Sequence, residues 1–206
     1  MRTLVDLLLS LPAVLWAVSF HEGCHGWASW KLGDPTAKMR GRLSLNPLEH
    51  FDLWGTLALL VFRFGWAKPV PIDPRYYKNP RRDIVLVSLA GPAGNFLTAL
   101  VVGRILRWSA VYLLSGAFGG VPLLEVLQYF VIINLGFGLF NLLPIPPLDG
   151  SKVFLPLFPR AWQRWIWQYE RYGFFVLIAL VYTGATAYIL GYPLTLLYRL
   201  VISPWW

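Results

Sequence analysis

The sequence predicts an all-α polytopic membrane protein with about four to six transmembrane segments. Its 206 residues are 57% hydrophobic and only 14% charged, whereas soluble domains carry roughly 25% charged residues. Several apolar runs approach the length of about 20 residues that a helix needs to cross the hydrocarbon core. These runs and their connections use nearly all of the chain, so we expect a single integral-membrane domain over residues 1–206.

Four long apolar runs are the predicted spans. They cover residues 4–30, 84–102, 121–143 and 174–190. A fifth run, residues 53–64, is too short to cross comfortably, and we interpret it as a candidate re-entrant segment. The last run, residues 194–202, follows a glycine and a proline and ends in tryptophans, which predicts a tilted or interfacial tail.

The first apolar run has a second interpretation as a secretory signal peptide. That interpretation requires the run to end in small residues near Ala17 and Ser19. The apolar run instead continues through Glu22 to Trp30 and Lys31, which favours an uncleaved helix.

The basic residues predict the orientation in the membrane. Ten of the eighteen lie between Lys31 and Arg82, and four lie between Lys152 and Arg171. The positive-inside rule makes both regions cytoplasmic and places the N-terminus on the outer side of the membrane. We expect the protein to reside in the cell membrane. A net charge of +8 would suggest nucleic acid in a soluble protein. Here the charge lies in loops between spans, so we expect the lipid bilayer and no nucleic acid as partner.

The segment HEGCH places two histidines and a glutamate near the end of the first span. Residues four apart lie on one face of a helix, so His21 and His25 can direct both imidazoles at one ion. Glu22 lies about 100° round the helix, where it can contact a water on that ion. This HExxH arrangement binds zinc through its histidines and uses the glutamate as a general base. We therefore predict a Zn²⁺ site.

The alternative is a pair of helix-interior histidines that make only hydrogen bonds, with Glu22 paired to a basic residue. Charged groups within a span cost a few kcal/mol at mid-bilayer and usually mark function, which favours metal binding. A catalytic zinc usually has three protein ligands. A further ligand must therefore come from another part of the chain.

The candidate for that ligand lies in NLLPIPPLDG, residues 141–150. Its prolines prevent a helix, so the third span should become extended here. Broken backbone at membrane depth is tolerated only where it lines a cavity or packs in protein, so Asp149 is well placed to be an oxygen ligand. The alternative is a surface loop in which Asp149 caps the helix that follows.

HEGCH and NLLPIPPLDG together resemble the site-2 protease family, zinc metalloproteases that cut substrates within the membrane. AGPAGN, GRLSLNPLEHFDLWGT and GWAKPVP resemble the short prokaryotic members, and the resemblance covers residues 21 to about 153 in order. It implies a zinc held by His21, His25 and Asp149, with Glu22 as the catalytic base.

The resemblance also implies roles for two asparagines. Asn141 precedes Asp149 by the family spacing and would steady the substrate carbonyl or oxyanion. Asn95 would project polar groups into the cavity and contact the substrate. By their chemistry alone these residues are intramembrane amides, which commonly hold helices together. Cys24 stands where a small or aliphatic residue is expected, and we expect it to pack.

Alternating residues in TAKMRGRLSL, residues 36–45, predict a short edge strand at the cytoplasmic side. Basic residues alternate there with Met39, Gly41 and Leu43. We expect Met39 and Gly41 to bind an unwound substrate by strand addition. The alternative is a basic face that lies against anionic lipid headgroups.

The predicted function is hydrolysis of peptide bonds within or near transmembrane segments, with a transmembrane protein or peptide as substrate. One rival is a metal or proton transporter, because intramembrane ionisable groups often line ion paths. Another is a relative that binds membrane proteins without cutting them. Glu22 distinguishes the first rival, since only a hydrolase needs a base beside the first histidine. The sequence names neither the substrate nor the oligomeric state.

Overall fold

The computed structural model describes residues 2–55, 57, 65–114 and 120–203. The named helices in this part of the chain are α1 (Arg2–Lys31), α2 (Thr36–Met39), α3 (Pro47–His50), α5 (Pro80–Leu114), α6 (Gly120–Asn141), α7 (Asp149–Phe154), α8 (Arg160–Tyr182) and α9 (Ala185–Ile202), with the 3₁₀ helices η1 (Pro74–Tyr76) and η2 (Leu155–Leu157). The all-α prediction is confirmed. Of the candidate re-entrant run, residues 56 and 58–64 lie outside the described residues.

Four helices in the described part of the chain are long and apolar enough to cross a membrane. They are Leu4–Lys31, Pro80–Ser109, Pro122–Asn141 and Ala185–Ile202. The first three match predicted spans, which confirms an integral membrane protein. The fourth does not match the predicted residues 174–190.

The fourth predicted span is interrupted by Gly184. This residue has φ +75°, a left-handed conformation that glycine adopts without steric cost. Helix α8 therefore ends at Tyr182, and α9 begins at Ala185. Helix α9 continues through Pro193. Residues 194–202, predicted as an interfacial tail, are therefore part of a helix long enough to span the membrane. A proline within a span is tolerated because neighbouring groups can satisfy the freed carbonyl.

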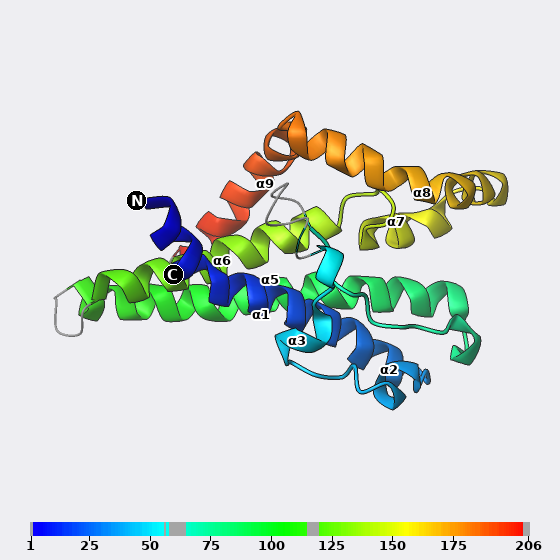
Figure 1. The fold of residues 1–206 in the computed structure, drawn as a ribbon, viewed down its shortest axis with the longest axis horizontal. Helices are drawn as coiled ribbons and strands as arrows, with labels where there is room; N and C mark the ends of the chain where they lie inside the picture. The colour runs from blue at the N-terminus through cyan, green and yellow to red at the C-terminus, as the bar shows by residue number, and fades with distance from the viewer. Residues whose placement is uncertain (1, 56, 58–64, 115–119, 204–206) are drawn as a thin grey trace.

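Helices α1, α5 and α6 form the body of the protein and pack side by side, with α9 against α5 and α6 (Figure 1). Glycines permit this close packing, as they do in many membrane proteins. A Cβ atom at Gly94 would lie 2.5 Å from Sγ of Cys24, and one at Gly138 would lie 2.9 Å from Cε1 of Phe96. Cys24 thus packs against α5, as expected.

Described parts of both basic regions lie at one end of the helical body (Figure 1). The C-terminal end of α1, helix α2 and the start of α5 lie there, as do α7 and the start of α8, whereas both chain termini lie towards the other end. Arg104 and Arg107 lie away from these regions and donate to the last carbonyls of α9. The distances are 2.8 Å from Arg104 to the Ser203 oxygen and 3.0 Å from Arg107 to the Ile202 oxygen. These two arginines therefore cap a helix C-terminus.

The predicted edge strand does not form over residues 36–45. Thr36–Met39 is a helix, Gly41 has φ +66°, and residues 42–46 join no ladder. Local hydrogen bonds outweigh the alternating pattern, because Asp34 Oδ1 accepts from the Thr36 amide and the Met39 amide donates to the Pro35 oxygen. Met39 and Gly41 thus lie in a helix and a turn rather than in a strand that a substrate could extend.

Candidate metal centre

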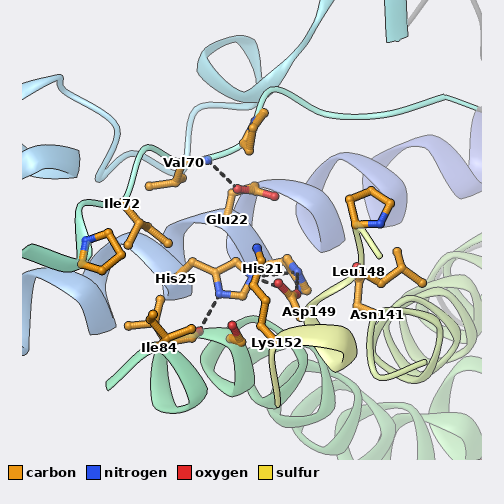
Figure 2. Close-up of a pocket in the computed structure, with 15 residues that line it drawn as sticks. His21, Glu22, His25, Val70, Ile72, Ile84, Asn141, Leu148, Asp149 and Lys152 are labelled. Carbon is orange, nitrogen blue, oxygen red and sulfur yellow. Dashed lines mark hydrogen bonds and ion pairs between the residues drawn. The ribbon is translucent and has the colours of Figure 1, made fainter. Parts of the chain in front are cut away.

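Three side chains from two distant segments meet beside the C-terminal half of α1 (Figure 2). Nε2 of His21 and Nε2 of His25 each lie 3.0 Å from Oδ2 of Asp149 and 3.0 Å from each other. All three residues are buried. The structure therefore brings the two histidines and the aspartate of the sequence prediction together.

The other ring nitrogen of each histidine has its own partner. Nδ1 of His25 lies 2.7 Å from the Val87 carbonyl oxygen, and Nδ1 of His21 lies 2.6 Å from Oδ1 of Asn95. A carbonyl oxygen can only accept, so Nδ1 of His25 donates, and in the neutral ring Nε2 carries the lone pair. Metal-binding histidines are usually arranged in this way.

Helices α5 and α6 shape the space around the two imidazoles. Gly91 lies directly beside them, because a Cβ atom there would be 2.5 Å from Nε2 of His25 and 2.7 Å from Cε1 of His21. The ring of Phe137 packs edge-on against His21 with centroids 4.9 Å apart. These contacts hold both rings on the side of α1 that faces Asp149.

Asp149 is the first residue of α7, and the extended residue Leu148 is the N-cap. Asp149 is therefore not the helix cap that the alternative interpretation required. Gly150 allows α7 to start against the end of α6, since a Cβ atom there would lie 2.2 Å from the Leu142 oxygen. The proline-containing segment thus ends by directing a carboxylate at α1.

These donors fit a zinc ion. Each histidine offers one nitrogen and Asp149 one oxygen, and the three atoms lie within 4.8 Å of one another. A tetrahedral zinc with ligand distances of about 2.0–2.1 Å separates its ligand atoms by roughly 3.3 Å. Two lone pairs and a carboxylate so close together repel unless a cation lies among them.

Glu22 lines the same cavity but lies apart from the three candidate ligands (Figure 2). Its Oε2 accepts a hydrogen bond of 2.9 Å from the Val70 amide. No group in the described part of the chain donates to Oε1, which leaves that oxygen available to a water molecule. This is the position that a general base beside a metal requires.

The cavity has a volume of about 310 Å³. Prolines and aliphatic side chains form much of its wall, and it is also lined by His21, Glu22, His25, Ser88, Asn141, Asp149 and Lys152. Ligand sites commonly combine an apolar wall with a few converging polar groups. The cavity therefore has the lining of a ligand site, next to the candidate metal ligands.

The two asparagines of the sequence prediction have different surroundings. Asn141 lines the cavity, and its Nδ2 donates one hydrogen bond of 3.0 Å to the Phe137 oxygen. An amide nitrogen carries two protons, so a second donor is left. Asn95 does not line the cavity: it is fully buried and contacts His21. The expectation that Asn95 reaches the substrate does not match this placement.

Several residues of the site were not predicted from the sequence. Val70, Lys152 and Gly91 contact or line it, and Asn134 contacts Asn95. The motif AGPAGN did single out the segment that contains Gly91. The sequence does contain one signal for Asn134, because a polar residue within a predicted span usually marks function.

Comparisons with known proteins bear on this geometry. The family described as Peptidase family M50 matches residues 111–183, which include Asn141 and Asp149. "Putative zinc metalloprotease YwhC" of Bacillus subtilis (strain 168) is 41% identical over 178 residues, which are 84% of this chain and 80% of the relative. The chain belongs to peptidase family M50, the site-2 protease family.

A second relative agrees with this membership. "Putative zinc metalloprotease Rip2" of Mycolicibacterium smegmatis is 28% identical over 185 residues, which are 86% of this chain and 68% of the relative. No solved structure matches the chain significantly. This M50 protein is a zinc metalloprotease and an integral membrane protein.

Proposed function

We propose that this M50 protein hydrolyses peptide bonds within or near the transmembrane segments of membrane proteins. In this proposal His21, His25 and Asp149 hold the zinc, and Glu22 is the general base. The observation that carries it is the convergence of both imidazoles of a membrane-spanning helix with a carboxylate 124 residues further along the chain. A site assembled among membrane-spanning helices favours a substrate that also lies in the membrane.

The depth of the site supports cleavage within the membrane. His25 lies six residues before Lys31, the last residue of α1, which corresponds to about 9 Å along a helix axis. The site then lies below the headgroups, towards the end of the protein where α2 and the starts of α5 and α8 lie. We accordingly propose that the protein resides in the cell membrane with its active site towards the cytoplasm.

Glu22 moves the protons of the proposed reaction. Held by His21, His25 and Asp149, zinc would act as a Lewis acid and would lower the pKa of water in the site. The free Oε1 of Glu22 accepts a proton from a water in the cavity and delivers it to the leaving amine. The hydrogen bond from the Val70 amide holds the carboxylate in place during both transfers.

Asn141 has the chemistry to stabilise the oxyanion that forms as the peptide carbonyl is attacked. Its Nδ2 is held by the Phe137 oxygen, and the second N–H of that amide is available to the substrate oxygen. A donor that is already oriented needs no reorganisation when the charge develops. Loss of one such donor typically costs about 100- to 1,000-fold in kcat.

The deciding experiment uses the full chain, purified with zinc, and a synthetic transmembrane peptide whose fragments are identified by mass spectrometry. Glu22→Gln should keep its zinc by metal analysis and lose cleavage by about 100- to 10,000-fold, the contribution of a general base. Glu49→Gln is the matched control, because Glu49 is exposed on α3.

Cleavage by Glu22→Gln at the wild-type rate would remove Glu22 from the mechanism. The transporter alternative predicts a different result: zinc or protons would cross vesicles that contain the protein, at a rate that Glu22→Gln leaves unchanged, and no peptide fragment would form. A protein that binds the peptide without cutting it would fit the non-proteolytic alternative.

A further inference from the structure

A chain of buried hydrogen bonds connects α6 to the candidate metal ligand His21. Nδ2 of Asn134 donates to the Phe130 oxygen at 2.9 Å, and Oδ1 of Asn134 accepts from Nδ2 of Asn95 at 3.0 Å. Nδ2 of Asn95 also donates to the Ala17 oxygen at 3.0 Å, and Oδ1 of Asn95 lies 2.6 Å from Nδ1 of His21. Both asparagines have an exposed fraction of 0%.

The direction of every hydrogen bond in this series follows from the first one, between Asn134 and the Phe130 oxygen. The Phe130 oxygen is a backbone carbonyl and can only accept, so the amide group of Asn134 must face it and Oδ1 must face Asn95. Asn95 must then present its own amide group to Asn134 and its Oδ1 to His21. Nδ1 of His21 is left as the donor, so in the neutral ring its Nε2 carries no hydrogen.

We propose that Asn134 is a positioning residue that acts through Asn95. It selects the histidine tautomer of His21 in which Nδ1 carries the proton and Nε2 directs its lone pair at the metal. The inference rests on the proposed metal site but does not depend on peptide cleavage. Polar partners behind a metal-binding histidine orient the ring in this way, and their loss typically costs about 10- to 100-fold in metal affinity or activity.

His25 does not need such a chain. Its Nδ1 reaches a backbone acceptor directly, the Val87 oxygen on α5 at 2.7 Å. His21 instead faces α5 and α6 where two amide side chains separate it from the Phe130 carbonyl. A change at residue 134 should therefore disturb one of the two histidines and leave the other in place.

Asparagines between membrane helices can also act only as interhelical contacts. A matched hydrogen bond exists nearby: Nε1 of Trp16 donates to Oγ1 of Thr98 at 3.1 Å, which also joins α1 to α5. Thr98 is buried, lies three residues after Asn95 and contacts no candidate ligand. Thr98→Val thus removes a comparable interhelical bond without touching the chain that ends at His21.

The test compares Asn134→Leu, Asn134→Asp and Thr98→Val in the full chain, with zinc affinity measured by competition against a chromophoric chelator. Asn134→Leu should bind zinc about 10- to 100-fold more weakly. Asn134→Asp should stay within a few-fold of wild type, because the aspartate presents an oxygen to Asn95 whether or not it is protonated. Thr98→Val should match wild type.

Wild-type affinity in Asn134→Leu would overturn the inference, as would an equal loss in Thr98→Val. A wild-type protein that binds no zinc would instead overturn the proposed metal site itself. If Asn134→Leu fails to fold, the ¹⁵N spectrum of the zinc-loaded wild-type protein decides, since the chain has only three histidines. A hydrogen-bonded proton on Nδ1 of His21 supports the inference, and coordination through Nδ1 refutes it.

Discussion

Gly91 and His25 are so close that the imidazole occupies the space that a side chain at residue 91 would fill. A Cβ atom at that position would lie 2.5 Å from Nε2 of His25, a separation that real Cβ atoms essentially never show. Because Nε2 is the proposed ligand atom, the missing side chain of Gly91 is a condition for the site. The close approach of a helix backbone is a common reason for glycine in membrane helices.

Gly91→Ala should therefore lower the zinc content of the purified protein well below one ion per chain. The added methyl group pushes both imidazoles away from Asp149. Gly136→Ala is the control, because a Cβ atom there has no neighbour within 4 Å. Metal analysis together with helix content by circular dichroism checks the prediction. Full zinc occupancy in Gly91→Ala would mean that the two histidines do not bind the metal in the positions that the structure gives them.

Removal of the metal should lower the thermal stability of the wild-type protein. A ligand present at 100 times its Kd stabilises the folded state by about 2.7 kcal/mol. Chelator should therefore lower the Tm of the wild type but leave that of Asp149→Asn nearly unchanged, because the neutral amide is a poor zinc ligand. A thermal scan with and without chelator measures both. An equal shift in the two proteins would exclude Asp149 as a ligand.

Arg42 should affect the reaction without contacting the metal. It is buried, and it donates to the Glu49 oxygen and, at 2.7 Å, to the Lys68 oxygen. These bonds hold the segment whose Val70 amide contacts Glu22. Arg42→Ala should lower the cleavage rate on the order of 10- to 100-fold, because small displacements of catalytic groups are costly.

The zinc content of Arg42→Ala should stay at the wild-type level, since no candidate ligand contacts this arginine. Arg40→Ala is the matched control, because Arg40 is exposed two residues earlier. Cleavage assays and metal analysis on the same samples separate the two effects. A loss of zinc along with activity would show that Arg42 supports the fold as a whole rather than the position of Glu22.

Asp34, in the loop after α1, should make the free energy of unfolding decrease at acid pH. Burial raises the pKa of Asp34, but hydrogen bonds from the Thr36 side chain, from the backbone amides of Asp73 and Thr36 and from the Ser29 hydroxyl outweigh it. The pKa therefore lies below its ordinary value of 3.8. A carboxyl group with a lowered pKa in the folded state contributes stability above its unfolded pKa. That contribution is lost as the pH falls through the folded pKa.

Asp34→Asn should therefore be less stable than wild type at neutral pH, and the difference should shrink as the pH falls below about 4. Denaturant unfolding in detergent between pH 7 and pH 3 measures the difference at each pH. Ser203→Ala, at the opposite end of the protein, serves as the control and should show a constant difference. A pH-independent difference for Asp34→Asn would contradict the lowered pKa.

The sequence predicted the helices better than it predicted their ends. Long apolar runs specify spans because a chain in lipid must satisfy its backbone within each segment. The break at Gly184 was missed because the apolar run continues on both sides of it, and only the left-handed backbone at this residue separates α8 from α9. The strand over residues 36–45 was predicted from alternation, which hydrogen bonds around Asp34 outweigh.

The sequence by itself determined the membrane class and the arrangement of His21, Glu22 and His25, because both follow from local rules: apolar length and the four-residue repeat of a helix. Only the tertiary structure decided which groups stand behind these residues. Asn95 meets His21 across 74 positions of the chain, and Val70 meets Glu22 across 48. Such partners depend on how α1, α5 and the segment before η1 pack, and no local pattern of residues encodes that packing.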